Sequence, residues 1–274
     1  MNWQHKRREI TELIRHKPHD ADLRITLIQC LCMCGDWSRA LKQIDQFKKI
    51  FPDLNNNLLI YLFNQVESEL RRTGVFQANH KPLTFQQNVD YNGILEQQLS
   101  LLALFQEKQP NPSLLTEMHT ELLNNIPDAA CTIQYRSTAT EIVQVQEKWL
   151  IDGDARIATV CELFVNGQYY WQPWYTFSQI SFIPPQNQLD VIWRSAQITL
   201  KDGKTFHAVI PARYYFEYDE HHEDALLSSV AQTTWTQTIL SSCFMGQGQK
   251  MLYGEQNEYP YLDIENLMFS SIVN

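Results

Sequence analysis

The chain has 274 residues, of which 44% are hydrophobic, and its formal net charge is −9. That length and composition suffice for one large domain or two ordinary ones and argue against global disorder. The acidic balance also argues against a nucleic-acid-binding protein, because proteins that follow phosphates usually show a basic excess.

No segment of the sequence approaches the roughly 20 consecutive apolar residues that span a bilayer, and the polar start lacks the apolar core of a secretory signal. Three of the six cysteines are crowded together as Cys30, Cys32 and Cys34. On a helix this spacing points the thiols in different directions, so we expect reduced core cysteines. The sequence therefore predicts a cytoplasmic protein without membrane insertion.

The first half of the chain predicts a series of helices. Asp20 can cap the second helix, Gly35 separates it from the third, and Pro52 stops the third. Ser113 can cap the last helix. The predicted spans are Trp3–His16, Ala21–Cys34, Trp37–Ile50, Asn57–Arg72, Asn92–Lys108 and Leu114–Asn125.

The second and third predicted helices have the lengths of one tetratricopeptide-like helical hairpin, a unit of about 34 residues. Ala40 supplies the small residue that a close approach of two helices needs. The spacing from Pro110 to Pro127 repeats that from Gly35 to Pro52, although Leu115 replaces the small residue. We interpret it as a degenerate second copy.

The composition changes after about Ala130, where β-branched and aromatic residues become frequent. Two hairpins are predicted, with turns at Asn166-Gly167 and Asp202-Gly203. Their strands are Val160–Val165, Gln168–Trp171, Ile198–Leu200 and Thr205–Ile210, and further strands are expected at Gln179–Ile183 and Tyr261–Ile264. A helix is expected at Glu223–Thr234.

These elements place the chain in the α+β class. A tetratricopeptide-like helical domain is expected over residues 1–128. A mixed, mainly antiparallel domain with at least one helix is expected over 129–274, with the boundary between Pro127 and Lys148.

The segment Asp152-Gly153-Asp154 superficially suggests a calcium loop, but Ile157 and Val160 break the ligand pattern that such a loop needs. We instead expect a tight turn whose carboxylates accept backbone amides or pair with Arg156. The arginines of Trp193-Arg194 and Arg213-Tyr214 are expected to stack on aromatic rings or to pair with the same carboxylates.

Neither histidines nor glycines complete a recognised cofactor or metal pattern. His221 and His222 are adjacent, so they point apart and cannot easily share one metal ion. We expect them to open a helix. Gly246 and Gly248 lack the spacing that wraps phosphates. No cofactor is predicted.

The order and spacing of these short motifs resemble one family, the type VI secretion accessory proteins called ImpE, SciE or TagJ. The resemblance runs from about Ala21 to the end, although Ala158-Thr159 stands where the family usually has Gly-Pro. The residues that carry it in the second half, and to which it gives a structural role, are Trp149, Asp152, Asp154, Arg156, Glu162, Trp193, Arg194 and Arg213.

This resemblance implies a non-catalytic accessory protein that binds the N-terminal helix of the small contractile-sheath subunit and modulates sheath assembly or disassembly. A tetratricopeptide unit would present the groove on its first helix. The stripe expected to line it consists of Asp22, Ile25, Thr26, Gln29, Cys32 and Met33. The same stripe could instead pack against Trp3–His16 or the second domain. The oligomeric state stays open, a homo-oligomer included.

The alternative hypothesis is a metal-dependent enzyme in the C-terminal domain. It would use His221, Asp152, Asp154 or Glu162 as ligands or acid-base groups. This requires the carboxylates to converge in one cleft, which sequence spacing alone does not establish.

Overall fold

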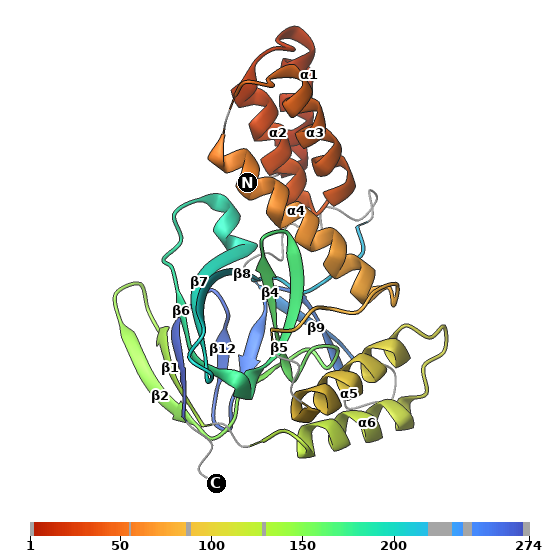
Figure 1. Cartoon of the computed structure of the whole chain (residues 1–274), viewed down its shortest axis with the longest axis vertical. Helices are drawn as coiled ribbons and strands as arrows, with labels where there is room; N and C mark the ends of the chain where they lie inside the picture. The colour runs from red at the N-terminus through yellow and green to blue at the C-terminus, as the bar shows by residue number, and fades with distance from the viewer. Residues whose placement is uncertain are drawn as a thin grey trace.

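The computed structural model describes residues 3–54, 56–85, 89–127, 130–218, 232–237 and 243–270. Within these ranges six α-helices precede a large antiparallel sheet (Figure 1). The α+β class expected from the sequence is therefore confirmed, while the tetratricopeptide character of the helices stays a prediction. None of the described helices is long and apolar enough to cross a membrane.

The first three helices have the predicted bounds, and the later three differ at their ends. α4 continues past Arg72, and α5 begins and ends earlier than expected. The cap of α6 is Asn111 rather than Ser113, because the Asn111 side chain accepts from the backbone amides of Ser113 and Leu114. The helices are α1 (Trp3–His16), α2 (Ala21–Cys34), α3 (Trp37–Ile50), α4 (Asn57–Phe76), α5 (Val89–Phe105) and α6 (Pro112–Asn124).

Local signals explain the agreement for α2 and α3. Asp20 caps α2 by accepting from the amide of Leu23, and Gly35 ends it with a φ of 80°. Positive φ is easily adopted by glycine because it has no Cβ. Asp36 then caps α3 by accepting from the amide of Arg39.

The main sheet has the strand order β2-β1-β13-β6-β7-β8-β4-β5, and all neighbouring pairs are antiparallel. Two small sheets, β12-β11-β3 and β10-β9, accompany it. The strands are β1 (Cys131–Arg136), β2 (Ile142–Glu147), β3 (Ile151–Asp152), β4 (Val160–Val165), β5 (Gln168–Pro173), β6 (Phe177–Phe182), β7 (Trp193–Leu200), β8 (Thr205–Pro211), β9 (Thr233–Gln237), β10 (Phe244–Gly248), β11 (Met251–Tyr253), β12 (Glu258–Pro260) and β13 (Ile264–Phe269).

Both predicted hairpin turns are confirmed, with different geometry. Asn166 and Gly167 have φ values of 51° and 74°, as a type I′ turn requires. In the second hairpin only Gly203 has a positive φ, of 86°. The amide of Leu200 donates to the carbonyl of Lys204, so this loop is one residue longer.

Two other predictions need correction. Residues 219–231, which hold most of the helix expected at Glu223–Thr234, lie outside the described residues, and Thr233 and Thr234 begin β9. The strand expected at Tyr261–Ile264 is wrong, because residues 261–263 form a turn before β13. β13 lies between β1 and β6, and its sequence lacks the polar-apolar alternation of a half-exposed strand.

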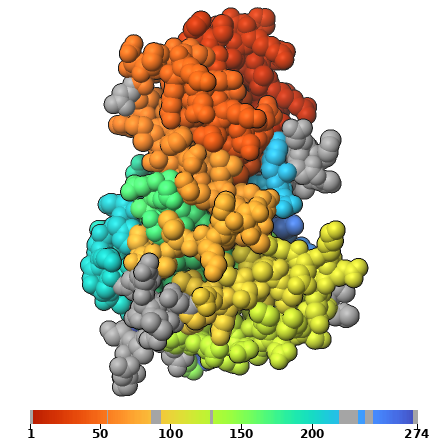
Figure 2. Space-filling view, turned by 45° about the vertical axis from the view of Figure 1, so that its right-hand side comes forward, coloured from red at the N-terminus to blue at the C-terminus, as the bar shows by residue number. Residues whose placement is uncertain are grey.

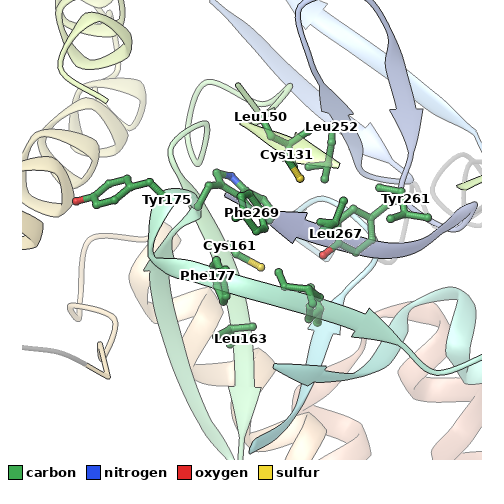
Figure 3. Packing of buried hydrophobic residues seen from close by; sticks show 14 of the residues in the cluster. Cys131, Leu150, Cys161, Leu163, Tyr175, Phe177, Leu252, Tyr261, Leu267 and Phe269 are labelled. Carbon is green, nitrogen blue, oxygen red and sulfur yellow. The ribbon is translucent and has the colours of Figure 1, made fainter. Parts of the chain in front are cut away.

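The core consists of two clusters, and each contains residues from both sides of residue 128. One includes α5, α6 and the sheet. In Figure 3, Cys161 and Leu163 of β4 gather with Phe177 of β6, near Leu267 and Phe269 of β13. The second joins α1 to α4 and part of α5 with the opposite face of the sheet, where β4 contributes Val160 and Phe164. All six cysteines are buried, and none of them forms a disulfide within the described residues.

Candidate functional site

Helix α4 packs against the β4–β5 hairpin and so connects the helical part of the chain to the sheet part. Arg71 donates from Nε to the carbonyl of Gly167 at 2.9 Å, and Ser68 donates from Oγ to that of Gln168 at 3.2 Å. Figure 2 shows the orange residues of this helix lying directly against the green residues of the hairpin. The contact explains why α4 has a buried polar face, which includes Glu69 and Arg72.

Glu162 of β4 is the centre of a buried charge cluster. Arg72 binds it in a bidentate way, at 2.7 Å from Nε to Oε1 and 2.9 Å from Nη2 to Oε2. Lys250 Nζ lies 2.5 Å from Oε2, and the Tyr169 hydroxyl donates to Oε1 at 2.5 Å. The side chains of Arg72, Lys250 and Glu162 are at most 2% exposed. We call Glu69, Arg72, Asp152, Glu162 and Lys250 the charge cluster.

The cluster extends to the edge of the helical part through Glu69. Trp193 donates from Nε1 to Glu69 Oε1 at 3.0 Å, and Arg72 Nη1 lies 3.3 Å from Oε2. Arg72 also donates from Nη2 to the backbone carbonyl of Arg213 at 3.0 Å. One arginine of α4 thus bonds to two separate segments of the sheet part.

Two carboxylates of the cluster respond differently to burial. Burial alone raises the pKa of Glu162, but the charges of Arg72 and Lys250 outweigh it and lower this pKa to about 2. For Asp152 burial dominates and raises the pKa to about 7, although Lys250 opposes it from 3.6 Å. Glu162 is therefore ionised at neutral pH, whereas Asp152 titrates near neutrality.

The turn predicted at Asp152-Gly153-Asp154 is confirmed. Asp152 Oδ1 accepts from the amide of Asp154 at 3.0 Å, and Asp154 Oδ1 accepts from the amide of Arg156 at 2.9 Å. Asp154 also pairs with the guanidinium of Arg156 and accepts from the amide of Gly246. A Cβ at Gly153 would lie 2.4 Å from the Tyr253 ring, so the close approach of β11 requires glycine there.

Both arginines singled out by sequence stack on aromatic rings rather than pairing with Asp152 and Asp154. Arg213 lies over Trp37 and Phe216, at 5.3 and 4.8 Å from the ring centroids. It donates to the carbonyls of Met33 at 2.9 Å and Cys32 at 3.1 Å. A cation at the carbonyl end of α2 is favoured by the helix dipole.

Arg194 lies deeper in the sheet part. Its guanidinium is 4.2 Å from the Phe182 ring centroid and donates to the carbonyls of Tyr261 and Ile264. Burial lowers the pKa of both Arg194 and Arg213 to about 10. Arg194 therefore stabilises contacts within the sheet part, whereas Arg213 connects the sheet part to α2.

The structure brings Asp152 and Glu162 together through Lys250, but it leaves Trp149 39% exposed, with its ring at the surface. Sequence reasoning missed Glu69 and Arg72, the partners from α4. Their available signal was a pair of opposite charges three residues apart on the predicted helix.

The stripe predicted as an outward groove on α2 is largely covered, which corrects that interpretation. Ile25, Cys32 and Met33 are at most 9% exposed and belong to the cluster that contains Ile10 of α1 and Trp193 of β7. Only the polar members of the stripe reach solvent: Asp22 is exposed, and Thr26 and Gln29 are half-buried. The alternative packing expected for this stripe is the one observed.

The carboxylates of the enzyme hypothesis do converge in part, but onto buried cations rather than into a cleft. Asp152 and Glu162 meet Lys250, and Asp154 meets Arg156. No group of three His, Cys, Asp or Glu side chains suited to a metal ion is found among the described residues. His221 lies outside them.

A separate apolar pocket opens between the end of α6 and the sheet. Its volume is about 280 Å³, and we call it the tryptophan pocket. Trp149 is exposed, whereas Trp174 is 3% exposed and its buried Nε1 has no hydrogen-bond partner among the described residues. The lining residues are Leu123, Ile126, Pro127, Trp149, Leu150, Ile151, Trp174, Tyr175 and Phe269.

The chain is similar to known proteins in both sequence and fold. Residues 144–268 match the family model described as ImpE protein. The type VI secretion system accessory component TagJ of Pseudomonas aeruginosa is 29% identical over 267 residues, which cover 95% of this chain and 85% of that protein. The crystal structure of protein VPA1032 from Vibrio parahaemolyticus has a TM-score of 0.81 at 19% identity. The match covers 99% of this chain and 95% of that one, and it shows the same fold.

Proposed function

Because this chain is a member of the ImpE family, we propose that it is a non-catalytic accessory component of a type VI secretion system. In this role it binds the N-terminal helix of the small sheath subunit in the cytoplasm and modulates sheath assembly or disassembly. The observation that carries the proposal is the similarity to TagJ, which extends over both the helical and the sheet parts.

The charge cluster supports a scaffold rather than a reaction centre. Glu162 is held by Arg72, Lys250 and Tyr169. Breaking a buried ion pair is costly, because it leaves an uncompensated charge. We therefore assign the cluster to fixing the helices on the sheet, so that surfaces formed by both parts keep one geometry.

For the helix-binding surface we propose the tryptophan pocket instead of the covered α2 stripe. Its lining is mainly apolar, which suits the apolar face of an amphipathic helix. Trp149 offers a large exposed ring at the rim, and tryptophan is enriched among the residues that dominate binding energies. Trp174 contributes a buried aromatic ring to the pocket wall.

The test is fluorescence anisotropy with a labelled peptide of the sheath subunit's N-terminal helix. Trp149→Ala should weaken binding by at least about 2 kcal/mol, roughly 30-fold in Kd. Trp174→Phe should weaken it less, because an aromatic ring remains in the pocket wall. The control is Ile60→Ala, which truncates another exposed apolar residue on α4, 52% exposed against 39% for Trp149.

If the wild type binds the peptide and both tryptophan variants bind it with the same affinity, the helix-binding surface lies elsewhere on the protein. Failure of the wild type to bind the helix at all would reject the proposed partner. Thermal melts of each variant establish that the fold is intact.

A further inference from the structure

Strand β2 forms one outer edge of the eight-stranded sheet, with β1 as its sole strand neighbour among the described residues (Figure 1). The amide of Ser137 donates to the carbonyl of Glu141, and the pairing register continues from there through the two strands. Since backbone bonds alternate sides along an antiparallel strand, Val143 and Val145 bond toward β1. The amides and carbonyls of the alternate residues, Ile142, Gln144 and Gln146, therefore point away from the sheet.

The opposite edge of the sheet is covered by Leu83, whereas no described residue outside β1 pairs with β2. Leu83 donates to the carbonyl of Tyr169 and accepts from the amide of Trp171, and Pro173 ends β5. These are usual protections of an edge strand. β2 contains no lysine, proline or glycine, its pairing with β1 has no bulge, and Ile142 is 58% exposed.

We propose that β2 pairs antiparallel with β2 of a second copy of this chain, about a two-fold axis at Gln144. The register follows from symmetry. In an antiparallel ladder, two residues that lie opposite each other either both bond across to the partner strand or both bond away from it. Neighbouring residues differ in this respect, so a two-fold axis between identical strands must place a residue opposite its own copy. Of the outward-bonding residues Gln144 is central, which places Ile142 opposite Gln146 of the partner subunit.

The side chains of β2 favour a second copy in this register. On the exposed face, Gln134 donates from Nε2 to Gln144 Oε1 at 3.0 Å, and the axis would continue this glutamine row into the partner. On the half-buried face, Val143 would lie opposite Val145 of the partner subunit, twice by symmetry. Such cross-strand pairs of β-branched residues stabilise sheets.

No charge opposes this pairing in the centre of the strand. Residues 142–146 are uncharged. Glu147 is buried and accepts from the hydroxyl of Tyr259 and the amide of Gln256 within its own subunit. At each end of the pairing Glu141, which is exposed, would lie opposite Glu147 of the partner subunit.

Disulfide trapping tests the register. Gln144→Cys should form a disulfide-linked dimer on oxidation, because Cα atoms of a hydrogen-bonded pair lie about 5.5 Å apart, within disulfide range. The six native cysteines are buried and should not compete. In the control, Gln146→Cys, the two thiols would be about 13 Å apart along the strands and should not link.

Light scattering after size exclusion tests the dimer itself, independently of any sheath helix. The wild type should have twice the 32.2 kDa mass of one chain. Gln144→Pro should be a monomer that remains folded by circular dichroism, because its amide does not bond to β1. Gln144→Lys should also be a monomer, since two cations would meet at the axis. Val145→Pro should lower stability as well, because its amide does bond to β1.

A wild type of single-chain mass at all concentrations would overturn the proposal. A dimer that Gln144→Cys does not trap, or that Gln144→Pro and Gln144→Lys leave intact, would overturn it too.

Discussion

The change Glu162→Gln removes the one anion that Arg72 and Lys250 share inside the protein. Both cations remain buried, at 2% side-chain exposure, and lose their closest counter-charge. The pKa of Glu162 falls from 4.5 to about 2 on folding, which corresponds to about 3 kcal/mol of stability at neutral pH. Loss of one partner from a buried ion pair costs about 3–5 kcal/mol, which is the same magnitude.

This contribution has a defined pH dependence. Since folding lowers the pKa of Glu162, the stabilisation is fully present above about pH 4.5 and is lost as the pH falls toward 2. Urea denaturation of wild type and Glu162→Gln should therefore differ by about 3 kcal/mol at pH 7 and by clearly less at pH 3.

The matched control is Glu265→Gln, which removes the carboxylate of an exposed pair with Arg136 at 2.7 Å. It should change the free energy of unfolding by about 1 kcal/mol or less. If Glu162→Gln cost no more than this control, or cost the same at pH 3 as at pH 7, the assigned role of the charge cluster would be wrong.

Three further predictions concern the buried parts of both halves. Folding raises the pKa of Asp152 from 3.8 to about 7, so the folded state loses stability as the pH rises through that range and the carboxyl ionises. Asp152→Asn stays neutral, so urea titrations should show it gaining stability relative to the wild type between pH 4 and 7. Trp37→Ala should lose about 3–5 kcal/mol in thermal or urea melts and Ala40→Leu about 1–3 kcal/mol, because both residues are buried; unchanged melts would contradict the packing of α2 on α3. Ile25→Asp combined with Met33→Asp should unfold the helical part rather than merely weaken binding, which circular dichroism will detect.

The helices and turns that were predicted correctly from the sequence are bounded by residues that act only on the backbone next to them. Asp20, Gly35 and Pro52 act within one helical turn of the boundaries that they set, and Asn166-Gly167 forms its turn unaided. Such signals need no knowledge of the rest of the chain.

The charge cluster could not be predicted in the same way. Arg72 and Glu162 are 90 residues apart in sequence. The one local signal, the opposite charges of Glu69 and Arg72 three residues apart, is equally typical of a solvated helix face. Trp193 and Glu69 are 124 residues apart. Only the docking of α4 on the sheet gives these side chains their partners.

The α2 stripe shows a different limit. The apolar residues of α2 are spread over all sides of the helix. Leu27, Ile28 and Leu31 are buried as well as Ile25 and Met33. A helix that is hydrophobic on all sides is usually covered on all sides. That pattern was present in the sequence and favours the packed stripe over an open groove.

The most direct test of the proposed function is the affinity of the purified protein for the N-terminal helix peptide of the small sheath subunit. Isothermal titration of that peptide into wild type and Trp149→Ala, with a scrambled peptide of equal composition as the control, measures it. The account predicts saturable binding of the native peptide by the wild type and a roughly 30-fold weaker Kd for the variant. Equal heats for native and scrambled peptides, or equal Kd values for the two proteins, would contradict it.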